Sequence, residues 1–558
     1  MEMKTAKNIG IVMVLSTAAR GMSLLAGMLY TTYFGLGNLE LNIYSYAVNL
    51  PNLVFTCIGT ALFTVVIPIY TGGLAEGETL KASKFADNVI SVSLVFSVVM
   101  SIAGVLATPG IVSITESFSV GNWDFANMAI RLMFPLVIFH SLNHIYQALL
   151  QSNSRFVMPA VVSMVNGVAI IIYMLFFADA YGVTGLLVVT FAGFSVQPLM
   201  LLPSAHLAGY RYKPQFDFKN EDLRKAGKLA LPVLVSSSSY QLNMFVNVTL
   251  ATGFIGGAAA ITTTQNLAFT AAHLFILSTL AVMFPKMSAQ SSIGDIEGFK
   301  GSFTMILKLI IYFAIPASMG LAAVSGHIMS LLYGYGKMTD EGVMLMTTTF
   351  AIYALAIASI GIKEASDRAF YAMKDSKTPA IISVFIMVMN VALSLVLRKP
   401  LGIAGLPVAY AVSITSGALA LLYLVRKKTG LLTIKRQDEE SVKSMLVKCV
   451  ASGIIMVLTI LVINRVFFPD MVGVGFVGDA GAGGAGSVGD VGGAGAAGNT
   501  DTTLSNPIPL STPIPFPIRA LRLVISVLVG SVVYFLMTLA LKVEQTRKIL
   551  RVRRSKVG

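Results

Sequence analysis

The chain has 558 residues, of which 55% are hydrophobic and only 12% are charged, and its mean hydropathy is +0.78. Soluble globular proteins carry about 25% charged residues, so this composition excludes a soluble domain and indicates a polytopic membrane protein. The formal net charge of +14 does not indicate nucleic-acid binding, because the basic residues lie in short loops between apolar runs. The two cysteines, Cys57 and Cys449, lie in apolar runs without metal-ligand spacing.

Apolar runs of about 20 residues, the length that crosses a bilayer, recur along the chain. We find fourteen, at approximately 8–33, 43–70, 86–107, 128–150, 158–177, 184–207, 229–251, 258–283, 303–324, 342–362, 379–397, 402–425, 445–464 and 518–541. The sequence therefore predicts an all-α protein with fourteen transmembrane helices. An even number places both termini on one side, and most of the 40 Lys and Arg residues fall in loops on that side. Because cytoplasmic loops carry the Lys and Arg excess, we expect both termini in the cytoplasm.

Three landmarks recur in the two halves of the chain at an offset of about 220 residues. The segment from Asn42 to Pro68 corresponds to the segment from Gln265 to Pro285. Pro159 corresponds to Pro379, and GVTGL from Gly182 corresponds to GIAGL from Gly402. Internal repeats with polar residues at the interface between them are typical of secondary transporters. We therefore expect a pseudo-symmetric pair of six-helix lobes at 1–210 and 211–428, followed by the last two helices at 429–558.

The connection between the last two apolar runs differs in composition from the rest. At about 467–517 it is rich in glycine and alanine, and then in proline. Such residues offer few side chains for packing, so we expect a disordered outer loop.

Amide side chains mark the segment 42–70 as unusual for a membrane helix. Asn49 and Asn52 interrupt an otherwise apolar run, and Gln265 and Asn266 stand at the matching place in the second half. An amide facing hydrocarbon without a partner costs a few kcal/mol, so such helices are tolerated against protein or water. We expect these four amides to line a polar cavity.

Arg20 is the clearest charged residue inside an apolar run. It lies about twelve residues into the first run, too deep to reach the interface easily, so it should face a cavity and bind an anion such as a phosphate. The alternative is a structural pairing with a carbonyl or an amide. Arg131 and Lys308 lie near the ends of their runs and are expected to be interfacial anchors. His273 is interpreted as a hydrogen-bonded core residue.

The seventh apolar run carries three amides, Gln241, Asn243 and Asn247. Asn243 and Asn247 share a helix face because they are four residues apart. This pattern favours a polar cavity or an ion site over amides that only join helices.

Four stretches of the chain together resemble a known family. They are IYSYAVNLPNLVFTCIGTALFTVVIPIY, LPVLVSSSSYQLNMFVNVTLA, AFYAMKDSKTPAIIS and PLGIAGLPVAYAVS. Over most of its length the chain resembles the lipid II flippase (MurJ) family of the multidrug/oligosaccharidyl-lipid/polysaccharide exporter (MOP) superfamily. The resemblance implies two six-helix lobes in a V around a cationic cavity, with two C-terminal helices forming a groove for a polyprenyl tail. It also implies alternating-access transport of lipid II, the undecaprenyl-pyrophosphate-linked peptidoglycan precursor, from the inner to the outer leaflet.

The chain departs from this family at several cavity positions. Ala26 stands where a second arginine is usual, Asn42 where an acid is usual, and Phe55 near a third basic position. Gln265 and Asn266 replace an acid and arginine pair. A cavity with fewer fixed charges is expected to bind pyrophosphate less strongly.

The resemblance also implies a place for a coupling ion. The sodium-binding positions of some family members fall on Asn247, Asn390 and Ser394, and none of these is a carboxylate. Such a site is expected to hold sodium weakly.

The sequence thus predicts a non-enzymatic lipid II flippase of the bacterial cytoplasmic membrane, acting in peptidoglycan synthesis as a monomer. Its expected partners are lipid II or a similar polyprenyl-pyrophosphate glycolipid and membrane lipids, without a cofactor or structural metal. A monovalent cation or the membrane potential would supply the energy. The expected head-group ligands are Arg20, Asn49, Asn52, Gln265 and Asn266. The alternatives are an exporter of another lipid-linked oligosaccharide, a cation-coupled multidrug exporter, or an intramembrane glycosyl-transfer enzyme.

Overall fold

The computed structural model describes residues 2–75, 77–115, 118, 122–153, 155–217, 221–430, 441–467 and 515–546. Every regular element in these ranges is a helix, which confirms the all-α class. The loop expected at about 467–517 lies outside the described residues, apart from its ends.

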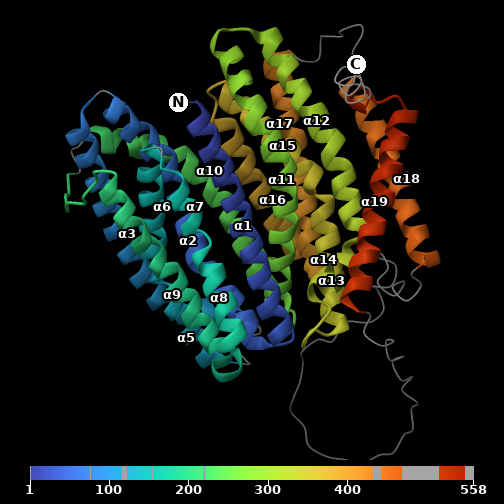
Figure 1. Ribbon diagram of the computed structural model, residues 1–558, viewed down its shortest axis with the longest axis horizontal. Helices are drawn as coiled ribbons and strands as arrows, with labels where there is room; N and C mark the ends of the chain where they lie inside the picture. Colours follow the sequence, from blue (N-terminus) through green and yellow to red (C-terminus); the bar gives the residue numbers. More distant parts are fainter. Residues whose placement is uncertain are drawn as a thin grey trace, which may run out of the picture.

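The first half of the chain forms one group of helices (Figure 1). Its members are α1 (Glu2–Phe34), α2 (Leu39–Ala75), α3 (Thr79–Ser113), α5 (Trp123–Met133), α6 (Leu136–Ser152), α7 (Val157–Val162), α8 (Val165–Phe176) and α9 (Ala178–Leu207). Helix α6 packs against α2, α3 and α9, and α8 packs against α1 and α9.

The second half forms a second group. Its members are α10 (Glu221–Ala251), α11 (Gly257–Ser292), α12 (Ile296–Ala323), α13 (Ser325–Tyr333), α14 (Asp340–Leu355), α15 (Ile357–Ala372), α16 (Lys377–Leu401), η1 (Gly402–Ala404) and α17 (Gly405–Thr429). Figure 1 shows the first group slanting away from the second toward the end where the N-terminus lies, while α10 lies beside the first group and packs extensively against α2. The last helices, α18 (Val442–Phe467) and α19 (Phe516–Ala540), pack on α12 and on each other.

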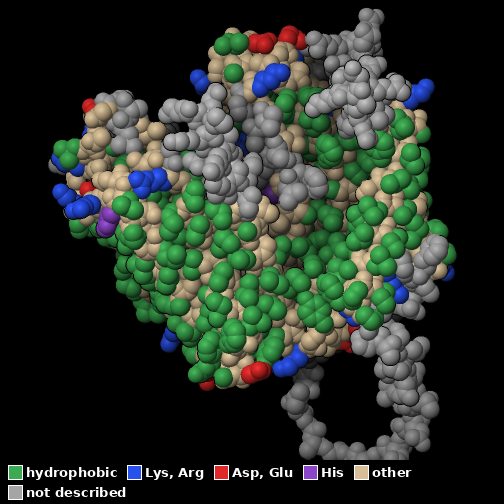
Figure 2. Space-filling view, in the orientation of Figure 1, with side chains coloured by type: hydrophobic (Ala, Val, Ile, Leu, Met, Phe, Trp, Pro, Cys, Tyr) green, Lys and Arg blue, Asp and Glu red, His purple; other side chains and the backbone are tan. Residues whose placement is uncertain are grey.

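The described helices suit a bilayer in length and in surface. Nine helices or joined helices in the described ranges are long and apolar enough to cross a membrane. Helices α1, α2, α10 and α11 have 33, 37, 31 and 36 residues. Figure 2 shows hydrophobic side chains over the flanks and charged side chains gathered near the two ends. The polytopic class is confirmed, and the count of fourteen stays a prediction.

Three predicted runs are broken helices. The run at 158–177 is divided between α7 and α8 at Ser163 and Met164. The run at 128–150 is divided between α5 and α6 at Pro135, which has no backbone N–H to continue the hydrogen-bond ladder. The run at 342–362 is divided between α14 and α15 at Ala356, and α15 continues to Ala372. This continuation carries charged side chains that the predicted boundaries leave in a loop.

Two glycines at equivalent points of the repeat share one backbone conformation. Gly182 has φ 55° and ψ −146°, and Gly402 has φ 56° and ψ −141°. This region is almost confined to glycine because a side chain would clash with the backbone. The two halves are therefore built alike at this turn. The lobe limits at 1–210, 211–428 and 429–558 stay predictions.

A buried ion pair joins the C-terminal segment to the second group. Lys308 Nζ lies 2.7 Å from Glu544 Oε2, and the two side chains are 3% and 17% exposed. The hydroxyl of Tyr534 also donates a hydrogen bond to the carbonyl of Tyr312 at 3.0 Å. The expectation that Lys308 is an interfacial anchor is therefore wrong, because its partner comes from the far end of the chain.

We expect Lys308→Met to lower the free energy of unfolding by about 3 kcal/mol, because it removes the cation beside a partly buried carboxylate. The double variant with Glu544→Leu should recover most of this loss, since an apolar pair of similar volume can replace a buried ion pair. Thermal unfolding of the purified protein measures both effects. Lys300→Met is the matched control on α12, because its partner Glu297 is 69% exposed and such pairs contribute little. Equal losses in the two lysine variants would contradict the prediction.

Candidate functional site

The two groups of helices meet at one end of the molecule. Hydrogen bonds there join Lys337 N to Thr32 O at 2.8 Å, Ala259 N to Asn42 Oδ1 at 3.3 Å, and the hydroxyls of Tyr46 and Thr249 at 3.2 Å. These residues lie near the end of α1, the start of α2, the end of α10, the start of α11 and the turn before α14. The contacts therefore join the two groups of helices at this end.

The side chain of Asn42 joins the two groups of helices at this end. Its Nδ2 donates to the carbonyl of Leu36 at 2.9 Å, and its Oδ1 accepts from the N–H of Ala259 in the first turn of α11. The first N–H groups of a helix have no partner within the helix, so Asn42 satisfies one of them across the interface. The side chain is 4% exposed and is not open to a ligand in this conformation.

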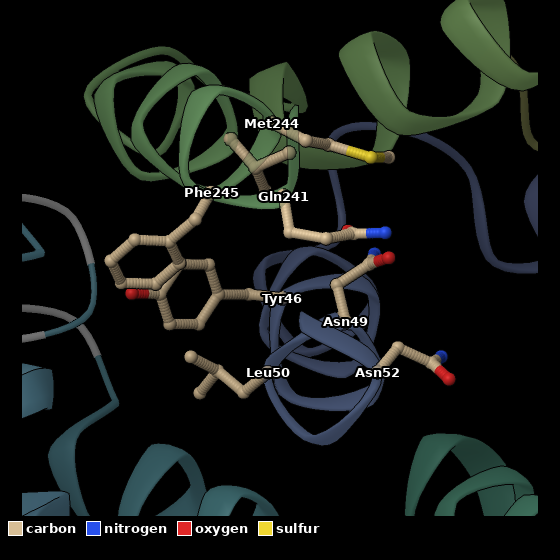
Figure 3. Close-up of a pocket in the computed structure, with 8 residues that line it drawn as sticks. Tyr46, Asn49, Leu50, Asn52, Gln241, Met244 and Phe245 are labelled. Atoms are coloured by element: carbon tan, nitrogen blue, oxygen red, sulfur yellow. The ribbon is translucent and has the colours of Figure 1, made fainter. Parts of the chain in front are cut away.

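A small, mainly apolar pocket that includes three amide side chains lies between α2 and α10 (Figure 3). It is lined by Tyr46, Asn49, Leu50, Asn52, Gln241, Met244, Phe245 and Val248. The amide ends of Asn49 and Gln241 lie next to each other, and Asn52 lies on the same side of α2. Its volume of about 30 Å³ admits water-sized groups. The pocket can therefore contact only part of a large head group.

The two asparagines of α2 are oriented by their own helix. Asn49 Nδ2 donates to the carbonyl of Ser45 at 2.7 Å, and Asn52 Nδ2 donates to the carbonyl of Val48 at 3.2 Å. Each bond returns to the residue four positions earlier, a common arrangement for polar side chains in helices. The amide oxygen of each asparagine is the atom left to accept from a ligand.

Arg20 has an exposed side chain on α1 and forms no hydrogen bond or ion pair with the part of the chain that the structure describes. It lies within electrostatic range of His273 on α11. His273, expected in the core, is only half-buried. An exposed guanidinium within an apolar helix can donate up to five hydrogen bonds to an anion.

The paired amides of α11 point to different environments. Gln265 is 1% exposed, and its Oε1 has no hydrogen-bond partner among the described residues. Asn266 is exposed. In this conformation Asn266 can contact a ligand, whereas Gln265 lies in the packing between helices. The sequence pattern could not separate them, because the rotation of α11 that decides which residue is buried depends on its neighbours.

The three residues expected to hold an ion come together between α10 and α16. Asn247 Oδ1 accepts from Asn390 Nδ2 at 3.0 Å and from Ser394 Oγ at 3.0 Å, and Asn390 Nδ2 also donates to Asn243 Oδ1. All four side chains are buried. Asn247 Nδ2 and Asn390 Oδ1 have no partner in the described ranges. The cluster offers neutral amide and hydroxyl oxygens and no carboxylate.

The KDSKTP motif forms a turn between α15 and α16. Asp375 accepts from the N–H of Thr378 at 3.1 Å, from its hydroxyl at 2.9 Å and from Lys428 Nζ of α17 at 2.8 Å. Burial acts to raise the pKa of Asp375, but the bonds from Lys428 and Thr378 outweigh it and lower the pKa below its ordinary value. The motif therefore fixes a turn against α17.

Two side chains near the space between the groups were not among the predicted ligands. Gln241 lines the pocket, and Glu364 lies on α15 within electrostatic range of His273. Gln241 is one of the three amides of the seventh apolar run, a pattern that favoured a polar cavity or an ion site, although it was not among the expected head-group ligands. Glu364 could not have been found from the sequence, since it follows the predicted end of its apolar run.

Comparison with known proteins agrees with this architecture. A family model described as lipid II flippase MurJ matches residues 30–476. The chain is 25% identical over 409 residues to a probable lipid II flippase MurJ of Treponema pallidum, covering 70% of this chain and 76% of the relative. It is 22% identical over 433 residues to a probable lipid II flippase MurJ of Vibrio cholerae, covering 74% and 81%.

Solved structures show the same fold. A lipid II flippase MurJ in an inward closed conformation aligns with a TM-score of 0.71 at 20% identity, covering 94% of this chain and 98% of that one. An inward-facing multidrug resistance MATE family transporter of the MOP superfamily aligns with a TM-score of 0.60 at 16% identity, covering 75% and 98%. Because the family model spans most of the chain, this protein belongs to the lipid II flippase MurJ family, a family of membrane transporters and not of enzymes.

Proposed function

We propose that the protein moves lipid II from the inner to the outer leaflet of the bacterial cytoplasmic membrane by alternating access. The observation that carries the proposal is Arg20, an exposed arginine in an apolar helix of the first group that lies within electrostatic range of His273 in the second group. The pyrophosphate and sugars of lipid II are too polar to cross hydrocarbon, whereas its polyprenyl tail can remain in the lipid. A protected route is therefore needed only for the head group.

In this proposal the head group enters the space between the two groups of helices from the end opposite the contacts that join them. Arg20 binds the pyrophosphate, because a planar guanidinium donates paired hydrogen bonds to phosphate oxygens. Asn49, Asn52 and Asn266 contact the sugar and peptide through their amides. Gln265 takes part only after the packing around α11 changes.

The same proposal includes orientation and assembly. Both termini lie in the cytoplasm, so the end at which the two groups are joined faces outward. One chain supplies both groups of helices and hence a complete transport route, so the protein acts as a monomer.

The test is depletion of the protein in cells that have no second lipid II flippase. Lipid II should accumulate in the inner leaflet, and its accessibility to a membrane-impermeant lipid II-binding reagent should fall. Re-expression of the native chain should restore the accessibility. Unchanged accessibility after depletion would reject the proposed function.

We also propose that the cluster of Asn243, Asn247, Asn390 and Ser394 holds a monovalent cation weakly. Asn390 Oδ1 is a buried acceptor that has no partner in the described ranges, and such an oxygen in a protein is normally satisfied by a hydrogen-bond donor, a water or a cation. Neutral oxygens bind sodium less strongly than carboxylates do.

Asn247→Asp is expected to raise sodium affinity at least about tenfold, because it places a negative charge among buried oxygens. The measurement is the rise of the unfolding midpoint with sodium chloride at constant ionic strength, with choline chloride as the balancing salt. Asn266→Asp is the control, because Asn266 is exposed and lies outside the cluster. A sodium response no larger than that of the control would contradict the prediction.

A further inference from the structure

Several aromatic rings meet inside the second group of helices. The ring of Phe269 on α11 lies 6.2 Å from Tyr240 on α10 and 5.7 Å from Tyr410 on α17. Tyr410 lies 5.7 Å from Tyr353 on α14, and His273 lies 6.3 Å from Phe269. Tyr240 is 41% exposed, so the cluster is open on the side of α10.

Helix α15, which packs against α11 and α17, carries an acidic residue, Glu364. Glu364 lies about two turns beyond the break at Ala356, and its side chain is half-buried. It is within electrostatic range of Tyr240, His273 and Tyr410. Ionisable side chains within membrane helices are costly and usually have a function.

The neighbouring cations on α15 have other partners. Lys363 Nζ lies 2.6 Å from Asp367 Oδ2, although Lys363 is also within electrostatic range of Glu364. Arg368, four residues after Glu364, lies over the ring of Phe284 at 5.4 Å from its centroid. Glu364 itself forms no hydrogen bond or ion pair with the residues that the structure describes. Its carboxylate is therefore available to a ligand.

We propose that Glu364, Tyr240 and Phe269 form a binding site for an organic ammonium group. A carboxylate attracts the cation, and the faces of aromatic rings attract it further through cation–π interaction. The hydroxyl of Tyr353, whose ring is buried against Tyr410, has no partner among the described residues, so it adds a hydrogen-bonding group to the cluster.

The positive charge of Arg20 and the carboxylate of Glu364 share one neighbour: His273 is within electrostatic range of both. A ligand with an anionic group at Arg20 and an ammonium group at Glu364 would satisfy both. A free amine on the peptide of the lipid II head group has this chemistry, and so does a free organic cation. Only the first source rests on the proposed function.

The test measures binding of tetraethylammonium to the purified full chain at constant ionic strength. Glu364→Gln should weaken binding at least about tenfold, because it removes the charge and keeps the size of the side chain. Tyr240→Leu, at a partly exposed position, should weaken it about threefold. Glu341→Gln is the matched control, since Glu341 is exposed in the first turn of α14.

A second arm distinguishes the two sources of the ammonium group. Binding of lipid II with a free peptide amine is compared with binding of lipid II whose amine is acetylated. Tighter binding of the free amine, lost in Glu364→Gln, supports the head group as the source. Tetraethylammonium binding without this difference supports a free organic cation. Equal binding of both probes by native, Glu364→Gln and Tyr240→Leu proteins overturns the site, while lipid II transport by the native protein would leave the proposed function standing.

Discussion

Arg20→Ala is expected to reduce lipid II transport by about tenfold to a hundredfold. Charge-assisted hydrogen bonds contribute about 1.5–3 kcal/mol, and each 1.4 kcal/mol corresponds to a factor of about ten. Arg20 is exposed on α1, and no described residue pairs with it, so its donors are available to the substrate. Since Ala26 and Phe55 stand at other positions where the family usually has basic residues, few other cations can compensate.

Transport of lipid II in cells depleted of the native protein measures this effect. Arg20→Lys should retain part of the activity, because lysine keeps the charge but lacks the planar fork that matches a phosphate. Arg131→Ala is the control, since Arg131 is an exposed arginine on α5. Native-level transport by Arg20→Ala, with normal expression, would show that Arg20 does not bind the head group.

Gly336→Ala is expected to separate the two groups of helices at the end where they are joined. Gly336 has φ +71°, and a Cβ atom there would collide with the carbonyl oxygen of Thr32 in the first group of helices. The same carbonyl accepts the hydrogen bond from Lys337 N at 2.8 Å. Left-handed backbone costs a residue with a side chain about 1–2 kcal/mol, and the collision adds to that cost only while the end is closed. The closed population should therefore fall at least about tenfold relative to the open one.

The distance between spin labels at Asp124 and Glu341 measures this change, after Cys57 and Cys449 are replaced by serine. Both labelled positions are exposed, one in each group of helices. Gly294→Ala is the control, because Gly294 also has positive φ, at +74°, but has open space around its Cβ position. The two alanine variants should differ, with a longer-distance population only in Gly336→Ala. Identical distance distributions would contradict the prediction.

Several features of the fold could be predicted because they depend on local chemistry. The apolar runs indicated a helical membrane protein, and the matching turns at Gly182 and Gly402 reflect a requirement for glycine that is visible in the sequence. Asn247, Asn390 and Ser394 were expected together from family resemblance, and the structure places them in one cluster. Whether they bind an ion stays a prediction.

Other features depend on contacts between distant parts of the chain. Lys308 pairs with Glu544, although its sequence position suggested an interfacial anchor. Gln265 is buried while Asn266 is exposed, because the rotation of α11 decides which side faces its neighbours. Glu364 joins the aromatic cluster only because α15 continues beyond the predicted apolar run.

Local sequence was sufficient for the membrane class, the helical secondary structure and the repeated landmarks, because hydrophobic length and the conformational limits of glycine and proline act within a few residues. The meeting of polar side chains at the end where the two groups are joined, in the amide cluster and beside the aromatic rings became visible only in the folded chain. Those contacts depend on the tilt and rotation of helices that are far apart in sequence, and no local pattern specifies them.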